Sequence, residues 1–152
     1  MTDTVDAGLG ASLREAAVAL RAATDAVVRP LGLSVAQYSC LLHLDREPGC
    51  SGADVARAAY VSRQSTHVLL RSMEADDLVT RTSAPGRAQA WWLTPRGQEL
   101  LALAHREVVR LDARVQALAD EVAPDGDPRA LRRLLEAFVG VLAEPAAGGD
   151  VT

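Results

Sequence analysis

The sequence predicts a mainly α-helical protein of about six helices, interrupted once by a small two-stranded β-hairpin. Hydrophobic residues make up 49% of its 152 residues but aromatic residues only 3%, so Ala, Leu and Val must supply the core. Ala and Leu favour helices. Apolar residues recur at helical spacing along most of the chain, and the period shortens to that of strands only between residues 78 and 93.

Two helices are predicted before residue 50. The first covers residues 10–29 and ends at Pro30. The second covers residues 34–46, and Ser34 followed three residues later by Gln37 has the pattern of a capping box at its start.

The next two helices form a helix-turn-helix pair. Ser51 and Asp54 again have capping-box spacing, which starts a short helix at residues 51–59. Ser62 caps a longer helix at residues 62–76, separated from the short one by a tight turn. The residues expected on the inner side of this longer helix are Thr66, Leu69, Leu70 and Met73.

A β-hairpin follows directly. Residues 78–82 and 88–93 read as short strands, and the Pro-Gly pair within residues 83–87 suits a type II turn. Adjacent strand residues face opposite sides, so we expect Trp91 in the core and Trp92 exposed or against a neighbouring element. A helix-turn-helix followed by such a hairpin is a winged helix-turn-helix.

Two further helices complete the chain, at residues 95–123 and 128–142, the first of them with Thr94 as its cap and proline in its first turn. Their apolar faces, with that of residues 10–29, are too large for the core of one protomer. We therefore expect them to pack across a two-fold axis in a homodimer.

The charge of the chain is unevenly distributed. All sixteen basic residues are Arg, and the net charge is −4. Residues 57–96 nevertheless carry a local charge of +3, against −7 for the remainder, so positive charge gathers around the helix-turn-helix. No leader segment and no apolar run of membrane-spanning length is evident, which favours a soluble cytoplasmic protein without a membrane partner.

The pattern of residues 62–76 predicts a DNA-reading surface. In a winged helix-turn-helix this second helix enters the major groove and the hairpin tip reaches the minor groove or backbone. Glutamine and arginine side chains pair with adenine and guanine, and a helix N-terminus suits a phosphate. The outward-facing residues are Ser62, Arg63, Gln64, Ser65, His67, Val68 and Arg71, with Arg87 at the hairpin tip.

Other chemistry is weakly supported. Cys40 and Cys50 read as small core residues rather than redox sensors, because sensing thiols need exposure and thiolate character. The three histidines lack the spacing of metal ligands, so no metal is expected. No catalytic constellation and no phosphate-binding glycine loop is present, so the sequence predicts neither an enzyme nor a cofactor.

Five segments resemble the MarR family of transcriptional regulators: Leu33-Ser-Val-Ala-Gln-Tyr38, Ser51-Gly-Ala-Asp-Val-Ala56, Val61-Ser62, Leu78-Val-Thr-Arg81 and Leu93-Thr-Pro-Arg-Gly97. The resemblance implies one domain at residues 10–142, in which 51–97 bind DNA and both 10–30 and 95–142 dimerise. Residues 1–9 and 143–152 are expected to be disordered tails.

The resemblance also implies a function and site residues. Family members are mostly repressors released from pseudo-palindromic DNA by a small, often aromatic, effector or by an oxidant. It implies that double-stranded DNA is bound by Ser62, Arg63, Gln64, Ser65, His67, Arg71, Arg81 and Arg87. It places an effector beside Tyr38, His43, Arg46 and His105, between the second and fifth helices.

Two single positions and one short segment depart from the family pattern. Pro85 replaces the aspartate that usually precedes the wing arginine, Asp77 replaces the glycine that ends the recognition helix, and residues 66–68 differ from the usual pattern. Asp77 would need a left-handed backbone. These departures and the acidic net charge keep an alternative open: a winged-helix module that binds a small molecule or protein and has lost DNA binding.

Overall fold

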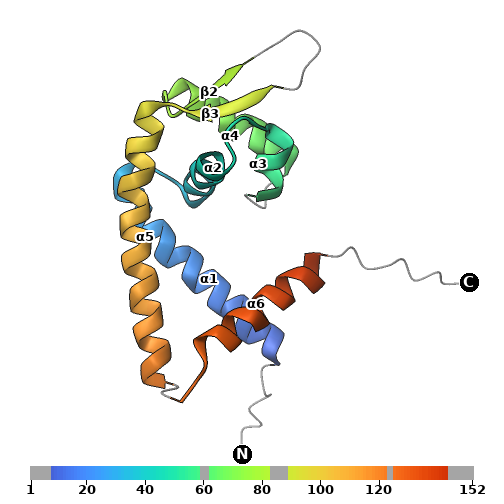
Figure 1. Cartoon of the computed structure of the whole chain (residues 1–152), viewed down its shortest axis with the longest axis vertical. Coiled ribbons are helices and arrows are strands. Elements are labelled where there is room, and N and C mark those ends of the chain that lie inside the picture. Colours follow the sequence, from blue (N-terminus) through green and yellow to red (C-terminus); the bar gives the residue numbers. More distant parts are fainter. Residues whose placement is uncertain (1–7, 59–61, 83–88, 123–124, 144–152) are drawn as a thin grey trace, which may run out of the picture. The chain divides into compact units, whose positions relative to one another are not determined.

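A computed structural model describes residues 8–58, 62–82, 89–122 and 125–143 (Figure 1). The elements follow the predicted order. They are α1 (Leu9–Val28), a 3-10 turn η1 (Arg29–Leu31), α2 (Val35–Arg46), β1 (Cys50–Ser51), α3 (Gly52–Ala58), α4 (Arg63–Ala75), β2 (Val79–Thr82), β3 (Ala90–Leu93), α5 (Pro95–Val122) and α6 (Pro128–Ala143). Of the expected tails at residues 1–9 and 143–152, residues 1–7 and 144–152 lie outside the described residues, whereas Leu9 begins α1 and Ala143 ends α6.

The predicted caps set the helix boundaries. Ser34 Oγ accepts from the backbone N–H of Gln37 at 3.2 Å, and Gln37 Oε1 accepts from the N–H of Ser34 at 2.8 Å, which completes the capping box of α2. At the start of α3, the Ser51 N–H donates to Asp54 Oδ2 at 2.9 Å. Both boxes predicted from the sequence are therefore confirmed.

The hairpin strands β2 and β3 pair antiparallel, with Val79 opposite Leu93 and Arg81 opposite Trp91. A third strand, which the sequence did not predict, joins them: β1 pairs antiparallel with β3, so the sheet order is β1-β3-β2. Trp91 is buried and Trp92 is 40% exposed, as expected for neighbours on opposite faces. The rings of Trp92 pass over Gly49, where a Cβ would come within 2.7 Å of them.

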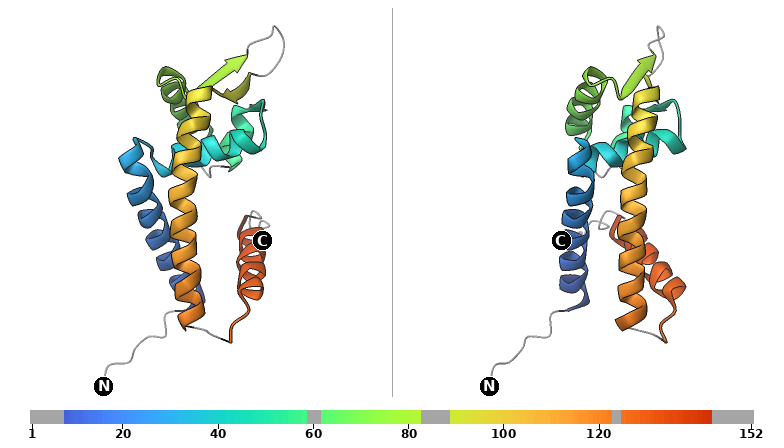
Figure 2. Two further views of the ribbon diagram at one scale, coloured as in Figure 1. Left: turned by 60° about the vertical axis from the view of Figure 1, so that its left-hand side comes forward. Right: turned by 90° about the vertical axis from the view of Figure 1, so that its left-hand side faces the viewer.

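Residues 1–111 form one compact unit, whose core lies between α2, α4, the sheet and the first turns of α5 (Figure 2). The largest fully buried side chains are Val28, Cys40, Leu41, Leu44, Val55, Thr66, Leu70, Met73 and Val79. Most of α1 is exposed, and only its C-terminal end enters this core.

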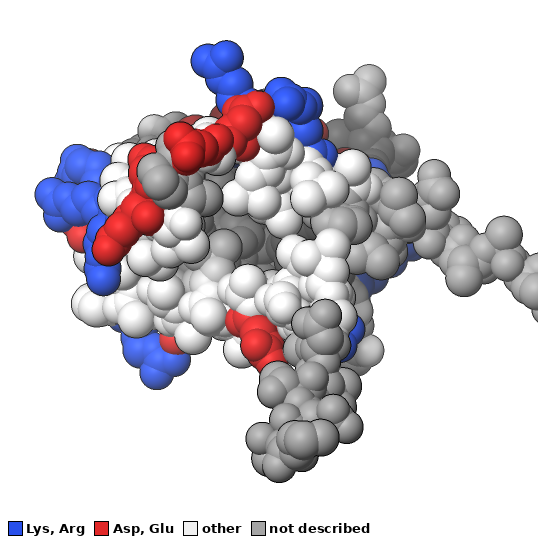
Figure 3. Space-filling model, turned by 90° about the horizontal axis from the view of Figure 1, so that it is seen from below, with Lys and Arg blue, Asp and Glu red and all other residues white. Residues whose placement is uncertain are grey.

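Residues 112–152 form a second unit, made of the C-terminal part of α5 together with α6. Its apolar side chains are exposed in the single chain. They include Val115, Leu118, Val122, Leu131, Leu134, Leu135 and Val139. Figure 3, which views the molecule from below, shows uncharged side chains over much of the surface seen from that side, with smaller groups of acidic and basic side chains around them.

Hydrogen bonds connect the end of α4 to the start of α5. Asp77 follows α4 with a φ of 56°, the left-handed conformation expected for it, and the Leu78 N–H donates to the carbonyl of Met73 at 2.9 Å. Thr94 Oγ1 donates to the carbonyl of Asp77 at 2.6 Å and accepts from the N–H of Gly97 at 3.0 Å. One threonine therefore caps α5 and ties it to the chain leaving α4.

None of the helices within the described residues combines the length and the apolar character needed to cross a membrane.

Candidate nucleic-acid interface

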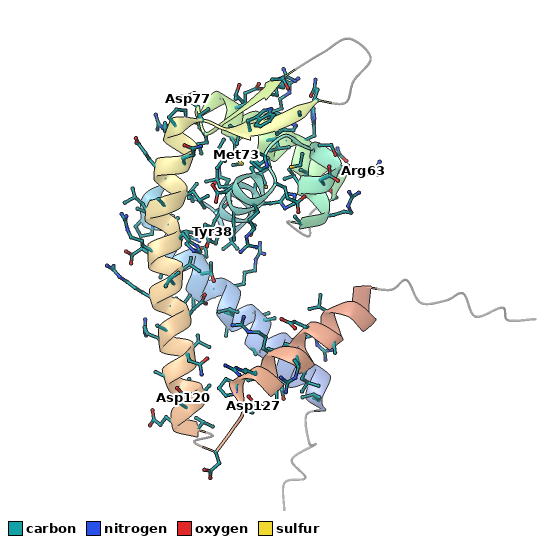
Figure 4. All side chains as sticks on the ribbon, viewed as in Figure 1. Tyr38, Arg63, Met73, Asp77, Asp120 and Asp127 are labelled. Atoms are coloured by element: carbon teal, nitrogen blue, oxygen red, sulfur yellow. The ribbon has the colours of Figure 1, made fainter. Side chains whose placement is uncertain are left out.

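The outer side of α4 is polar and open to solvent. Thr66, Leu70 and Met73 are buried and Leu69 is half-buried, which confirms the predicted inner side. The predicted DNA-facing residues on and before this helix are all exposed, namely Ser62, Arg63, Gln64, Ser65, His67 and Arg71. Arg63 projects from the first turn of the helix (Figure 4).

Ser62 is the N-cap of α4. Its Oγ accepts from the N–H of Ser65 at 3.1 Å, and the same hydroxyl donates to Ser65 Oγ at 2.9 Å. This arrangement fixes the first turn of α4, and the positive end of the helix dipole lies at the exposed Ser62. Such an end is suited to a phosphate oxygen.

Glu74 joins two of the predicted arginines. Arg81 Nε lies 3.0 Å from Glu74 Oε1, and Arg71 Nη1 lies 3.5 Å from Glu74 Oε2. The Arg81 guanidinium also donates to Gln89 Oε1 at 3.3 Å and lies 5.9 Å from the ring centre of Trp91. Arg81 thus fastens β2 to both α4 and β3, whereas Arg71 has one long ion pair on an exposed surface.

Sequence reasoning missed Glu74 and Gln89 as neighbours of the arginines. The three-residue spacing from Arg71 to Glu74 was a usable signal, because such residues share a helix face. Arg87 and Pro85 at the hairpin tip lie outside the described residues, so the geometry of that tip stays a prediction.

A second candidate site lies between α2 and α5. This site is a cavity of about 370 Å³ that involves two of the predicted effector residues. It is separate from a cavity of about 390 Å³ that opens beside α4. The cavity between α2 and α5 is lined by Leu42, Asp45, Arg46, Gln98, Leu101, Ala102 and His105. Arg46 and His105 are therefore brought together, as expected. The remaining lining residues were missed, although their helical spacing on α2 and α5 placed them on the same faces.

Neither Tyr38 nor His43 is among the residues that line this cavity. Tyr38 Oη lies 3.0 Å from His105 Nδ1, so the tyrosine, which is buried, orients the histidine that lines the cavity. His43 Nε2 is buried, lies 4.0 Å from Glu47 Oε2 and makes no hydrogen bond within the part of the chain that the structure describes.

The two cysteines have environments that suppress thiolate formation. Burial raises the pKa of the Cys40 thiol to about 12, and the neighbouring Cys50 adds to the rise. The pKa of Cys50 is also raised, chiefly by burial and then by the Asp54 and Glu47 carboxylates. Neither environment favours the thiolate, and Cys40 is buried while Cys50 is half-buried against the core, in keeping with their interpretation from the sequence. Among the described residues, no three His, Cys, Asp or Glu side chains gather as metal ligands would.

A family model and a known protein that resembles this chain along most of its length both point to helix-turn-helix transcriptional regulators. A family model described as MarR family matches residues 31–90. The HTH-type transcriptional repressor Rv2887 of Mycobacterium tuberculosis is 38% identical over 133 residues, which make up 86% of this chain and 93% of that protein.

Solved structures agree in fold. The structure of Rv2887 with salicylic acid matches with a TM-score of 0.69 at 36% identity, over 88% of this chain and 98% of that one. The structure of Rv2887 in complex with DNA matches with a TM-score of 0.60 at 32% identity, over the same shares of the two chains. With a winged helix-turn-helix, an exposed polar face on α4 and this likeness along nearly its whole length, the chain belongs to the MarR family of helix-turn-helix transcriptional regulators.

Proposed function

We propose that this protein is a repressor that binds a pseudo-palindromic DNA operator as a homodimer and leaves it when a small aromatic acid binds between α2 and α5. The observation that carries the proposal is the outer side of α4, where six polar side chains are exposed opposite a buried apolar side. Rv2887, its relative, has been crystallised with DNA and with salicylic acid. A regulator of this kind works in the cytoplasm, where the chromosome lies.

In the proposed complex α4 lies in the major groove. Gln64 and Arg71 read base edges, His67 and Ser65 add hydrogen bonds, and Arg63 contacts the backbone. Ser62 receives a phosphate at the helix N-terminus. Arg87 reaches the neighbouring minor groove from the hairpin tip. Arg81 already contacts Glu74 and Gln89, so it supports the base of the wing. Its positive charge, partly neutralised by Glu74, attracts a DNA phosphate.

The dimer is proposed to form through residues 10–30 and 95–142. Exposed apolar side chains lie on α6 and on the C-terminal part of α5, and three of them, Val115, Leu131 and Leu135, line a hollow of about 660 Å³ in the second unit together with polar residues. Exposure of such an apolar surface to water is unfavourable, and its burial against a second copy of the chain would stabilise the dimer. Two-fold pairing would set the two α4 helices about one turn of DNA apart.

The effector cavity has a chemistry that suits an aromatic carboxylate. Leu42, Leu101 and Ala102 supply an apolar wall for a ring, and Arg46 supplies a cation for the acid group. His105, oriented by Tyr38, adds a hydrogen-bonding nitrogen. A ligand here releases DNA only by binding more tightly to the arrangement that DNA does not fit.

The first experiment replaces arginines on the reading surface. We expect Arg71→Ala to weaken binding to DNA from upstream of the protein's own gene by about 1–3 kcal/mol, and Arg87→Ala to do the same, with the dimer still folded. Arg110→Ala is the matched control, because Arg110 is exposed and pairs with Glu107 at 2.7 Å on α5, as Arg71 pairs with Glu74 on α4. Arg110 lies in a segment proposed to dimerise, so its affinity is compared only after the variant is shown to be a dimer. Wild-type affinity in both reading-surface variants would place the DNA surface elsewhere.

A second titration separates the proposal from the alternative of a winged-helix module without DNA binding. A DNA-binding protein should bind random-sequence duplex at low salt, and its affinity should fall steeply as salt rises, because bound phosphates release counterions. Fluorescence anisotropy of a labelled duplex measures both. No binding at any salt concentration would favour a partner other than DNA.

A further inference from the structure

Val68 is an apolar side chain in the middle of the polar side of α4. It is 65% exposed, and among the thirteen residues of α4, all of them described, it is the large hydrophobic side chain that is exposed. It lies two residues from buried Thr66 and two from buried Leu70, which places it about 160° around the helix from either. Val68 therefore points away from the core.

The neighbours of Val68 are the residues proposed to read DNA. Gln64 lies one turn before it and Arg71 three residues after it, so the three form a single stripe along the outer side of α4. A shallow hollow runs beside this stripe, lined by Gln64, Ser65, Val68, Leu69 and Ser72. Val68 and Leu69 supply its apolar side chains, and Gln64, Ser65 and Ser72 supply its polar ones.

An exposed valine at this place needs a partner of matching chemistry. Exposure of its methyl groups contributes nothing to folding, and β-branched valine is a weaker helix former than alanine. Arg71, three residues after Val68, and Arg63, in the first turn of the helix, are cationic, which favours an anionic partner over an apolar protein surface. In the major groove the apolar feature is the C5-methyl group of thymine.

We propose that Val68 is a specificity-determining residue that contacts the C5-methyl group of a thymine in each operator half-site. This inference rests on the proposed DNA-binding function and narrows it. Four residues of helix rise by about 6 Å, close to two base-pair steps of about 3.4 Å each. The thymine therefore lies within about two base pairs of the adenine that Gln64 reads.

The experiment removes the methyl group from the DNA and the side chain from the protein independently. A duplex is first selected from a random-sequence library with the wild-type protein. Each thymine is then replaced in turn by deoxyuridine, which lacks only the C5-methyl group, and affinities are measured by fluorescence anisotropy for wild type and Val68→Ala. Val18→Ala is the matched control, since Val18 is 70% exposed on α1 and the substitution is identical.

We expect one thymine per half-site at which deoxyuridine weakens wild-type binding by about fourfold, the effect of one buried methyl group. In Val68→Ala the two duplexes should bind equally, whereas Val18→Ala should keep the fourfold ratio whatever its absolute affinity. Gln64→Ala should relax base preference within two base pairs of that thymine. Far-UV circular dichroism and the melting temperature of Val68→Ala should match wild type, because the residue is exposed.

A selected duplex in which no thymine shows a ratio that depends on Val68 would overturn this inference and leave DNA binding intact. The deoxyuridine series with wild-type protein tests it even if the variant fails to fold, since a duplex insensitive to every methyl deletion overturns it as well. Failure of the library to yield any enriched duplex would overturn the proposed function together with this inference.

Discussion

Gly97 allows the backbones of two elements to pack more closely than any residue with a Cβ would allow. The first turn of α5 passes so close to the chain leaving α4 that a Cβ on Gly97 would lie 2.0 Å from the carbonyl oxygen of Leu78 and 3.0 Å from its carbonyl carbon. Both atoms belong to the backbone, which cannot swing aside as a side chain can. The closing Leu-Thr-x-x-Gly pattern of residues 93–97 therefore has a steric cause.

We expect Gly97→Ala to destabilise the protein by about 3 kcal/mol or more, because the added methyl group must push α5 away from Leu78 and strain the hydrogen bonds of Thr94. Urea denaturation measures the loss. Gly10→Ala is the control: it adds the same methyl group within α1, where the nearest atom is 3.8 Å away, and should be neutral or slightly stabilising. Equal stability of the two variants would contradict the steric account.

At the scale of single residues, sequence reasoning succeeded where one local rule decides the outcome. The family resemblance implied a left-handed backbone at Asp77, which stands where a glycine commonly ends this helix, and its φ of 56° confirms it. Trp91 and Trp92 were assigned to opposite faces by strand alternation. The engagement of Arg81 by Glu74, Gln89 and Trp91 was not foreseen, because it joins three elements at once.

Among the elements, α3 has the cap with the clearest electrostatic signature. The Ser51 hydroxyl and the Ser51 backbone N–H both donate to the Asp54 carboxylate, and Arg57 lies beside it. These hydrogen bonds, and to a smaller extent Arg57 and His43, hold the pKa of Asp54 below its ordinary value of 3.8. The cap is therefore strongest when Asp54 is ionised.

This cap predicts a pH dependence. Because the pKa of Asp54 is lower in the folded than in the unfolded protein, its ionised form stabilises α3 above about pH 3.8 and loses that contribution as the pH falls through the folded value. We expect Ser51→Ala to raise the pKa of Asp54 toward 3.8, measured by carboxyl-carbon NMR titration. Ser39→Ala, whose hydroxyl donates to the carbonyl of Val35 within α2, should leave that pKa unchanged. An unaltered Asp54 pKa in Ser51→Ala would refute the assignment.

Element boundaries were predictable where caps and breakers are local. Every predicted helix and both hairpin strands appear within a few residues of their expected limits. The strand β1 was missed because two residues carry no period of their own, and its pairing of Cys50 with Trp91 is a contact between distant parts of the sequence. The residues that line the cavity between α2 and α5 could be predicted only in part, because the cavity forms where two helices far apart in the sequence pack together.

For the whole molecule, the main feature is apolar surface that one chain leaves uncovered. In the second unit Leu134 and Leu135 are 48% and 42% exposed, on a helix whose opposite side carries Arg133 and Glu136. An uncovered apolar side on α6 is the reason to expect that the folded protein is a dimer. Sequence reasoning reached the same expectation from periodicity alone.

We expect Leu135→Glu to raise the dimer dissociation constant at least tenfold, because it would bury an unpaired charge in the proposed interface. Sedimentation equilibrium measures the mass. Glu136→Lys reverses a charge on the polar side of α6 and should leave the dimer unchanged. If Leu135→Glu remained dimeric at the same concentrations, α6 would not form the interface.

The threonine that caps α5 has a mechanical consequence. Thr94 and Gly97 tie the beginning of this helix to the exit of α4, and its next two turns, from Gln98 to His105, form one wall of the proposed effector cavity. If a ligand in the proposed effector cavity displaced this wall, the displacement would reach the C-terminal end of α4 over about two helical turns. Release from DNA would then require no signal to travel through the protein interior.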